Sequence, residues 1–310
     1  MKIILSRKGF DSVHGGVASP ILPGGAMFSL PIPERPAMVS ARTRTYGQIR
    51  AGQWTAGQLA ADLTGGRVGT ADFAHLDPDL DAAGVPGRPR GWRAAFGQTG
   101  AAETHLQNHG VGPGDLFLFF GWFREAERLA PGRWCYRPDA PDRHVFFGWL
   151  QVAERHPVVP LAGLPRWLAG HPHHKTTPYG RADSVYVAAE GLQLPGVGAG
   201  RPGGGTFGQY RPELCLTAEG RTRSQWRLPA WFRPVEGRLP LSYHRNPRAW
   251  TPGEGHVLLD TAKQGQEFVL DTRYYPEAAG WLAELFGRKV SANPPRALPP
   301  SETPAPDRDG

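Results

Sequence analysis

The sequence predicts an α+β protein that is rich in short β-strands and has few, short helices. Glycine and proline contribute 41 and 32 of the 310 residues, and such dense turn-forming residues separate short elements. Hydrophobic residues make up 40% of the chain, including ten tryptophans and fourteen phenylalanines, which is enough apolar material for a sizeable core. Short apolar and aromatic runs recur between the turns, as is typical of strands.

The N-terminal elements follow from these runs. Residues 2–5 (KIIL) predict a short buried strand, which ends at the polar loop 6–12 (SRKGFDS). A second strand is expected near residues 27–32, after a turn-rich stretch. Residues 55–63 predict a short helix, because Leu59 and Leu63 lie four positions apart on one helix face. The next motif, HLDPDL, contains Pro78, which argues against a continuous helix there.

Two aromatic runs dominate the middle of the chain. Residues 115–123 (DLFLFFGWF) and 144–152 (HVFFGWLQV) predict neighbouring strands of one sheet or small barrel. A helix over residues 99–108 is expected before them, ended by Gly110. The later predictions are short helices at 164–168 and 280–286, strands at 184–188 and 214–217, a glycine-rich loop at 191–208 and an irregular aromatic segment at 225–232.

The organisation predicted along the chain is one domain over residues 1–290, followed by a tail. Residues 291–310 contain six prolines and no large aromatic side chain. Such a composition cannot bury enough apolar surface to fold, so we expect this tail to be disordered. No internal repeat and no clear domain boundary interrupts the preceding residues.

The charge of the chain favours an anionic partner. The formal net charge is +7 and the isoelectric point is about 9.7, as is common among proteins that bind nucleic acid or nucleotides. However, most of the basic residues are arginines, and heavy use of arginine, glycine, proline and alanine is also typical of a GC-rich genome. The charge alone therefore leaves both interpretations open.

Several classes of protein are excluded by what the sequence lacks. Cys135 and Cys215 are far apart and in no metal-binding spacing, which argues against a disulfide framework or a zinc ribbon. The N-terminal apolar run is too short for a signal peptide and no stretch approaches a membrane span, so a cytoplasmic location is expected. P-loop, GxSxG and zinc-deaminase motifs are also missing from the sequence.

The loop after the first predicted strand is the first candidate site. Arg7 and Lys8 offer contacts for a phosphate, and Gly9 allows a ligand to approach the backbone closely. Asp11 can act as a catalytic base or metal ligand, and Ser12 extends the polar, substrate-binding surface. The alternative interpretation is a solvated turn in which the aspartate caps the local backbone.

The second candidate is the HLDPD segment. In an extended chain alternate residues share a face, so His75, Asp77 and Asp79 can point the same way. One imidazole and two carboxylates suit a divalent metal or general acid–base catalysis. The alternative is a simple turn, because Asp-Pro-Asp is also a common turn composition.

Two groups of histidines complete the candidates. In the segment HPHHK, His171 and His173 are possible metal ligands and Lys175 is a possible phosphate contact. His105 and His109 lie four residues apart at the end of the predicted helix, where a surface or capping role is favoured over metal binding. The donors offered are nitrogen and oxygen, so any bound metal should be Mg, Mn, Fe or similar and not a cysteine-type zinc.

These segments together resemble a known family. The runs SRKGFDS, GGVASPILP, HLDPDL, GDLFLFFGWF, HVFFGWLQV and HPHHK are similar to the nucleotide modification associated domain 3 family, from about residue 1 to about residue 288. The resemblance implies an α+β, enzyme-like domain linked to systems that modify bases in DNA, often in phages and mobile elements. It also implies candidate site residues within the shared motifs: Arg7, Lys8, Asp11, His75, Asp77 and Asp79.

Three functions remain open from the sequence. The leading hypothesis is an enzyme that modifies nucleic-acid bases or nucleotides, in which Asp11, His75, Asp77 and Asp79 perform either acid–base or metal-assisted chemistry. The two aromatic runs are also similar to strands of the PUA-like and EVE-like barrels that read modified bases, so the alternative is a reader without catalysis. A metal-dependent nuclease that uses the same carboxylates with Mg²⁺ is a further alternative.

Overall fold

A mixed β-sheet forms the centre of the protein. The computed structural model describes residues 1–129, 132–158, 164–175, 179–262 and 265–287. The strands follow the order β16 (Glu267–Asp271), β1 (Lys2–Arg7), β8 (Leu116–Leu129), β10 (Arg143–Pro157), β11 (Asp183–Ala188) and β7 (Ala95–Thr99). β1 and β8 are parallel, and the other pairs on this path are antiparallel.

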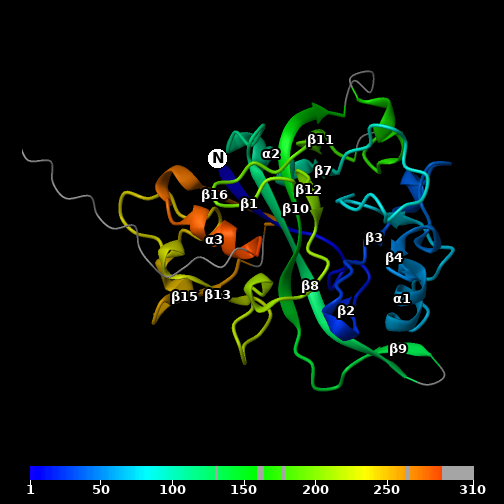
Figure 1. Ribbon diagram of the computed structural model, residues 1–310, viewed down its shortest axis with the longest axis horizontal. Coiled ribbons are helices and arrows are strands. Elements are labelled where there is room, and N and C mark those ends of the chain that lie inside the picture. The colour runs from blue at the N-terminus through cyan, green and yellow to red at the C-terminus, as the bar shows by residue number, and fades with distance from the viewer. Residues whose placement is uncertain (130–131, 159–163, 176–178, 263–264, 288–310) are drawn as a thin grey trace, which may run out of the picture.

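The two aromatic runs form β8 and β10, which are paired as predicted and cross the middle of the molecule (Figure 1). Three short strands join this sheet off the main path: β2 (Ser19–Ile21) and β9 (Arg133–Tyr136) pair with β8, and β12 (Gly204–Thr206) pairs with β10. In the described residues the strand order runs from β16 to β7 without closing into a barrel.

The core explains why these strands are continuously apolar. Ile3, Ile4 and Leu5 of β1 are all fully buried, and the first five residues of β8 are buried as well. A sheet that is covered on both faces has no solvent side and therefore needs no polar alternation. Aromatic rings fill one of these faces, where Phe96 and Phe117 meet edge to face at 5.0 Å.

The described residues contain three α-helices. α1 (Ala56–Leu63), α2 (Gly100–Asn108) and α3 (Ala278–Leu285) agree with the helices expected near residues 55–63, 99–108 and 280–286. Thr55 and Gln58 form a capping box at the start of α1, which satisfies two backbone groups that the helix leaves unpaired. Among the described residues, no helix is sufficiently long and apolar to cross a membrane.

Small sheets lie beside the central one. β13 (Gln225–Pro229), β15 (His256–Asp260) and β14 (Trp250–Gly253) form a three-stranded sheet. Two further pairs join β3 (Ile32–Pro33) to β6 (Ala74–His75) and β4 (Arg50–Ala51) to β5 (Trp54–Thr55). In Figure 1, β3, β4 and α1 lie on one side of β8 and β10, whereas β13, β15 and α3 lie on the other.

Some local predictions are wrong. The strand expected at residues 214–217 is instead a 3-10 turn at Pro212–Leu214, followed by two isolated bridges, from Cys215 to Val145 and from Thr217 to Trp226. Residues 225–232, expected to be irregular, contain β13. The strand expected near 27–32 is the two-residue β3. In each case, pairing with a distant segment determines whether a strand forms. A short window of sequence does not contain that partner. The tail predicted at 291–310 lies outside the described residues.

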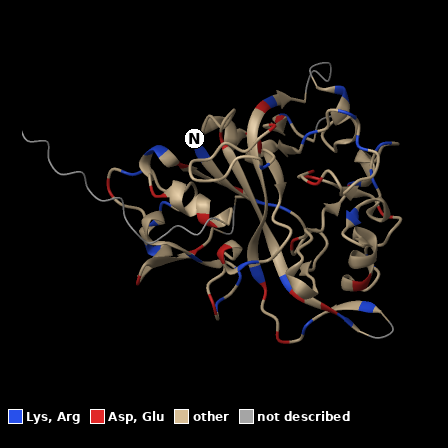
Figure 2. Ribbon diagram, viewed as in Figure 1, with Lys and Arg blue, Asp and Glu red and all other residues tan. Residues whose placement is uncertain are grey.

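Basic and acidic residues are interspersed over all parts of the fold (Figure 2). The formal charge of +7 is therefore spread through the molecule. A long nucleic-acid tract is typically bound by a stripe or patch in which one sign of charge gathers. The distribution of charge thus adds little to the sequence argument for such a partner.

Candidate metal centre

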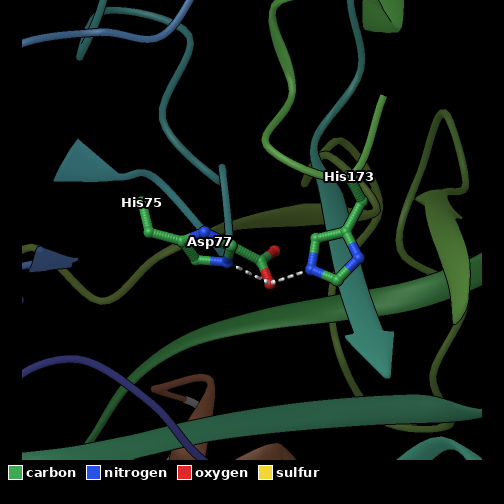
Figure 3. Close-up of side chains that lie close together, drawn as sticks. All are labelled: His75, Asp77 and His173. Atoms are coloured by element: carbon green, nitrogen blue, oxygen red, sulfur yellow. Dashed lines mark ion pairs between the residues drawn. The ribbon is translucent and has the colours of Figure 1, made fainter. Parts of the chain in front are cut away.

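Three side chains converge in the wall of a cavity. His75 ends β6, Asp77 follows two residues later, and His173 lies in the loop that leads to β11. Each offers one ligand atom, and these atoms lie within 4.8 Å of one another. Nε2 of His75 and Nε2 of His173 are 3.8 and 3.6 Å from the same Asp77 oxygen, Oδ2 (Figure 3). In the described part of the chain, no other group of three or more His, Cys, Asp or Glu side chains has this geometry.

The other nitrogen of each imidazole faces a carboxylate. His75 Nδ1 lies 3.2 Å from Glu34 Oε2, and His173 Nδ1 lies 2.5 Å from Asp183 Oδ1. Because an ionised carboxylate only accepts hydrogen bonds, each Nδ1 carries a proton. A neutral ring then keeps its lone pair on Nε2, the atom that faces Asp77. An ionised Asp77 also offers only lone pairs, so with both rings neutral three acceptors face one another.

Tyr179 connects the two carboxylates that orient the imidazoles. Its hydroxyl donates to Glu34 Oε2 at 2.8 Å, and its backbone N–H donates to Asp183 Oδ2 at 2.8 Å. Lys175 Nζ donates to the Tyr179 hydroxyl oxygen at 2.7 Å and to Glu34 Oε2 at 3.2 Å. Both imidazoles are therefore backed by a carboxylate that is itself fixed by further hydrogen bonds, as is usual around metal-binding histidines.

The surroundings keep the carboxylates ionised. Burial by itself raises the pKa of Glu34, but the hydrogen bond from His75 and other contacts outweigh it and lower that pKa to about 2. Burial also opposes ionisation of Asp77, yet the neighbouring imidazoles hold its pKa well below the usual range. Burial lowers the pKa of His173. For His75, burial lowers the pKa, but the hydrogen bonds and charges of Asp77 and Glu34 outweigh burial and raise it. The second proton that this shift favours lies on Nε2, and a bound metal would displace it.

A glycine on β7 brings Asp77 and His173 together. Asp77 Oδ1 accepts the backbone N–H of Gly97 at 2.8 Å. The His173 ring packs against the same residue, because a Cβ atom built on Gly97 would lie only 2.3 Å from that ring. Any larger residue at this position would therefore displace the imidazole from Asp77.

The metal cavity, which these three side chains line, has a volume of about 580 Å³. This is within the range of small-molecule sites. Arg7, Lys8 and Asp11 from the N-terminal loop and Glu267 from β16 line it too. Lys8 Nζ and Glu267 Oε1 form an ion pair at 2.8 Å. No ion pair of the described residues engages Arg7, so its guanidinium is available to an anion.

Two predicted metal ligands do not join the three-residue group. The Asp79 carboxylate is bound instead by both terminal nitrogens of Arg88. His171 lies close to Asp77, with Nε2 3.5 Å from Oδ1, but its Nδ1 accepts the backbone N–H of His173. A neutral His171 ring therefore carries its proton on Nε2 and has no lone pair to offer there.

The other predicted residues have mostly local partners. Asp11 Oδ1 accepts the backbone N–H groups of Val13 and His14, which is the capping turn that the sequence allowed, although Asp11 also lines the metal cavity. Ser12 is exposed. Lys175 is engaged by Glu34 and Tyr179, as described above, and so contributes to the arrangement of the centre.

The pair of helix-end histidines lies elsewhere. His105 Nε2 is 3.0 Å from the Ser242 hydroxyl, and His109 Nδ1 lies 2.9 Å from the His105 carbonyl oxygen, which is a capping contact. Sequence reasoning missed Glu34 and Asp183 altogether. Neither stands in a polar cluster or a motif, so only their spatial position beside the imidazoles reveals them.

Comparison with known proteins gives a family match. The model of the family described as nucleotide modification associated domain 3 matches residues 2–271. None of the curated proteins and none of the solved structures matches the chain. The matched range contains all three candidate ligands and the carboxylates behind them, so the whole centre lies within the region that the family shares.

Proposed function

Because the chain belongs to the nucleotide modification associated domain 3 family, we propose that it is an enzyme that modifies a nucleotide or a nucleic-acid base at a divalent metal ion bound by His75, Asp77 and His173. Family membership links the chain to nucleotide modification. The observation that carries the enzymatic part of the proposal is the convergence of three acceptor atoms inside one cavity.

Facing acceptors need a cation between them. With both rings neutral, the lone pairs of the two Nε2 atoms and of the Asp77 oxygen repel one another at these short separations. Two ligand atoms bound at right angles to one ion, each about 2.1 Å away, lie about 3 Å apart. The separations from Asp77 Oδ2, 3.6 and 3.8 Å, need only a small contraction to reach that arrangement.

The charge of the centre also fits a divalent ion. With neutral imidazoles, the three carboxylates of Glu34, Asp77 and Asp183 and the single ammonium of Lys175 leave a formal charge of −2. Two imidazoles and one carboxylate are the ligand set of non-haem iron sites that keep open positions for substrates. The ligand set contains no thiolate, so a structural zinc of the cysteine type is not expected.

Each residue has a defined task under this proposal. The bound ion would supply Lewis acidity or an activated water next to the substrate. Glu34 and Asp183 fix the tautomer and orientation of the two imidazoles. Arg7, in the wall of the same cavity, is positioned to hold a phosphate group of the substrate.

The test combines metal analysis with nucleoside analysis. Full-length protein without a histidine tag is measured for metal content before and after chelation, for the wild type, His173→Ala and His174→Ala. The second variant is the matched control, since His174 neighbours His173 but does not belong to the three-residue group. Nucleosides and free nucleotides from cells that express each form are compared by mass spectrometry.

The expected result is one divalent ion per chain and a modified nucleoside or nucleotide in the wild type and His174→Ala. His173→Ala should lose both. Absence of metal from the wild type, or an unchanged modification profile in His173→Ala, would overturn the metal-dependent mechanism. A wild type that alters no nucleoside but binds modified DNA tightly would favour a reader.

A further inference from the structure

A second cavity shares part of its wall with the metal cavity. Its volume is about 660 Å³. Gly9 and Asp77 line both cavities, so a ligand in the second one would lie next to the proposed metal centre. Gly9 has a positive φ of 81°, and a Cβ atom there would lie 2.5 Å from the Ser29 hydroxyl oxygen. The shared wall therefore depends on a residue without a side chain.

Aromatic and apolar side chains form most of the second cavity. Trp54 and Trp134 meet edge to face at 5.6 Å, and the Arg128 guanidinium lies 4.5 Å from the centre of the Trp54 ring. Phe28 and Leu76 also line the cavity. Trp134 is buried, whereas Trp54 is half-buried and Arg128 is exposed. Flat rings near the surface are typical platforms for a planar ligand.

Two buried N–H groups of this lining have no acceptor. Trp134 Nε1 and Arg88 Nε are both buried without a hydrogen-bond partner, and both residues line the second cavity. The Trp134 side chain is 5% exposed, which makes an unpaired donor there costly. The terminal nitrogens of Arg88 are already taken by Asp79, so the unpaired Nε is left to another acceptor.

The balanced charges of the lining favour an uncharged part of a ligand, such as a base, over a phosphate. Three arginines and three aspartates line the second cavity, which leaves no net formal charge: Arg50, Arg88, Arg128, Asp77, Asp79 and Asp81. A phosphate would gain little from such a balanced wall. A planar ring that carries carbonyl or ring-nitrogen acceptors matches both the aromatic surface and the two unpaired donors.

We propose that the second cavity binds the base of a nucleotide, with the ring against Trp54 and its acceptor atoms facing the N–H groups of Trp134 and Arg88. This inference rests on the proposed function for the identity of the ligand, since it assigns the base of the substrate to this cavity. The sugar and phosphate would then extend past Gly9 and Asp77 toward Arg7 in the metal cavity.

The experiment measures equilibrium binding in the absence of metal. Full-length protein stripped by a chelator is titrated by calorimetry with the four deoxynucleoside monophosphates. Trp134→Phe removes the N–H group and keeps most of the ring, and Trp54→Ala removes the stacking surface. Trp122→Phe is the matched control, because Trp122 Nε1 is also buried without a partner and its ring also contacts an arginine, Arg223, but Trp122 does not line the second cavity.

The wild type should bind at least one mononucleotide. Trp134→Phe should weaken this binding about tenfold, and Trp54→Ala about tenfold or more, whereas Trp122→Phe should bind like the wild type. Absence of binding by the wild type, or wild-type affinity in Trp134→Phe, would overturn the inference. Loss of binding in His173→Ala would also overturn it, because the base would then lie in the metal cavity. Trp134-dependent binding by a protein that holds no metal would support it and would overturn only the proposed metal chemistry.

Discussion

Two buried carboxylates in the wall of the metal cavity have opposite surroundings. Asp77 Oδ2 faces the Nε2 atoms of two imidazoles, His173 and His75, at 3.6 and 3.8 Å. Glu267 Oε1 instead accepts hydrogen bonds from Ser6 Oγ at 3.1 Å, Lys8 Nζ at 2.8 Å and Gln98 Nε2 at 2.5 Å. The second group is an internal ion pair that already contains its cation.

This difference distinguishes the proposed metal site from a structural salt bridge. What matters is whether donors or acceptors face the carboxylate, since both clusters are buried, polar and rich in titratable groups. Lys8 supplies the positive charge for Glu267 from within the chain. At Asp77 the two imidazoles are turned by Glu34 and Asp183 so that their Nε2 atoms point inward, and under the proposed function the cation comes from outside.

Breaking the internal pair should have the largest effect on stability. Glu267→Gln leaves the Lys8 ammonium, whose side chain is 10% exposed at the cavity wall, without its counter-ion; loss of one partner of a buried pair typically costs about 3–5 kcal/mol of the free energy of unfolding. Lys8→Met combined with Glu267→Gln should recover much of this loss, because neither charge is then left unpaired. Urea denaturation measures both variants. If Glu267→Gln also removed the bound metal, the two clusters would not be independent.

Metal binding should stabilise only the cluster around Asp77. A divalent ion present at about a hundred times its dissociation constant adds about 2.7 kcal/mol to the free energy of unfolding. Thermal unfolding with and without Mn²⁺ should therefore show a higher midpoint for the wild type and no shift for His173→Ala. An equal shift in both proteins would mean that the ion binds elsewhere on the chain.

The carboxylates behind the imidazoles should tune the affinity for metal. Asp183→Asn keeps an oxygen that can accept the Tyr179 N–H, but it removes the negative charge beside His173 Nδ1. Loss of such a supporting carboxylate typically weakens metal binding by about 10–100-fold. Competition with a coloured chelator measures this change. An unchanged affinity would show that the orientation of His173 does not depend on Asp183.

The fold was predictable where the signal is local. The aromatic runs at 115–123 and 144–152 became β8 and β10, and the spacing of Leu59 and Leu63 identified α1. The small sheet that contains β13 was missed, because β13 and β14 exist only through pairing with β15, which is distant from β13 in the sequence. A strand of this kind has no signature within its own few residues.

The candidate centre was likewise predictable only where the signal is local. His75 and Asp77 belong to one short motif and His173 to another, so each was found separately as a candidate. The two motifs meet at β7, because its Gly97 contacts both Asp77 and His173. Asp79 was grouped with its neighbours by alternation, but Arg88 holds it elsewhere. Pairing with a distant residue cannot be derived from the spacing within a motif.

The smallest effect should come from a carboxylate–imidazole pair at the surface. Glu154 Oε2 lies 3.0 Å from His156 Nε2, the same pair of groups as Asp183 and His173, but the Glu154 side chain is 44% exposed. Both groups are partly exposed there, as is Arg93, which pairs with the other Glu154 oxygen, so Glu154→Gln should change the free energy of unfolding by less than about 1 kcal/mol. Metal affinity should stay at the wild-type value, since this pair orients no ligand. Urea denaturation and chelator competition, run beside Asp183→Asn, make the comparison direct. If Glu154→Gln weakened metal binding as much as Asp183→Asn, the effect of the buried pair could not be ascribed to its position behind His173.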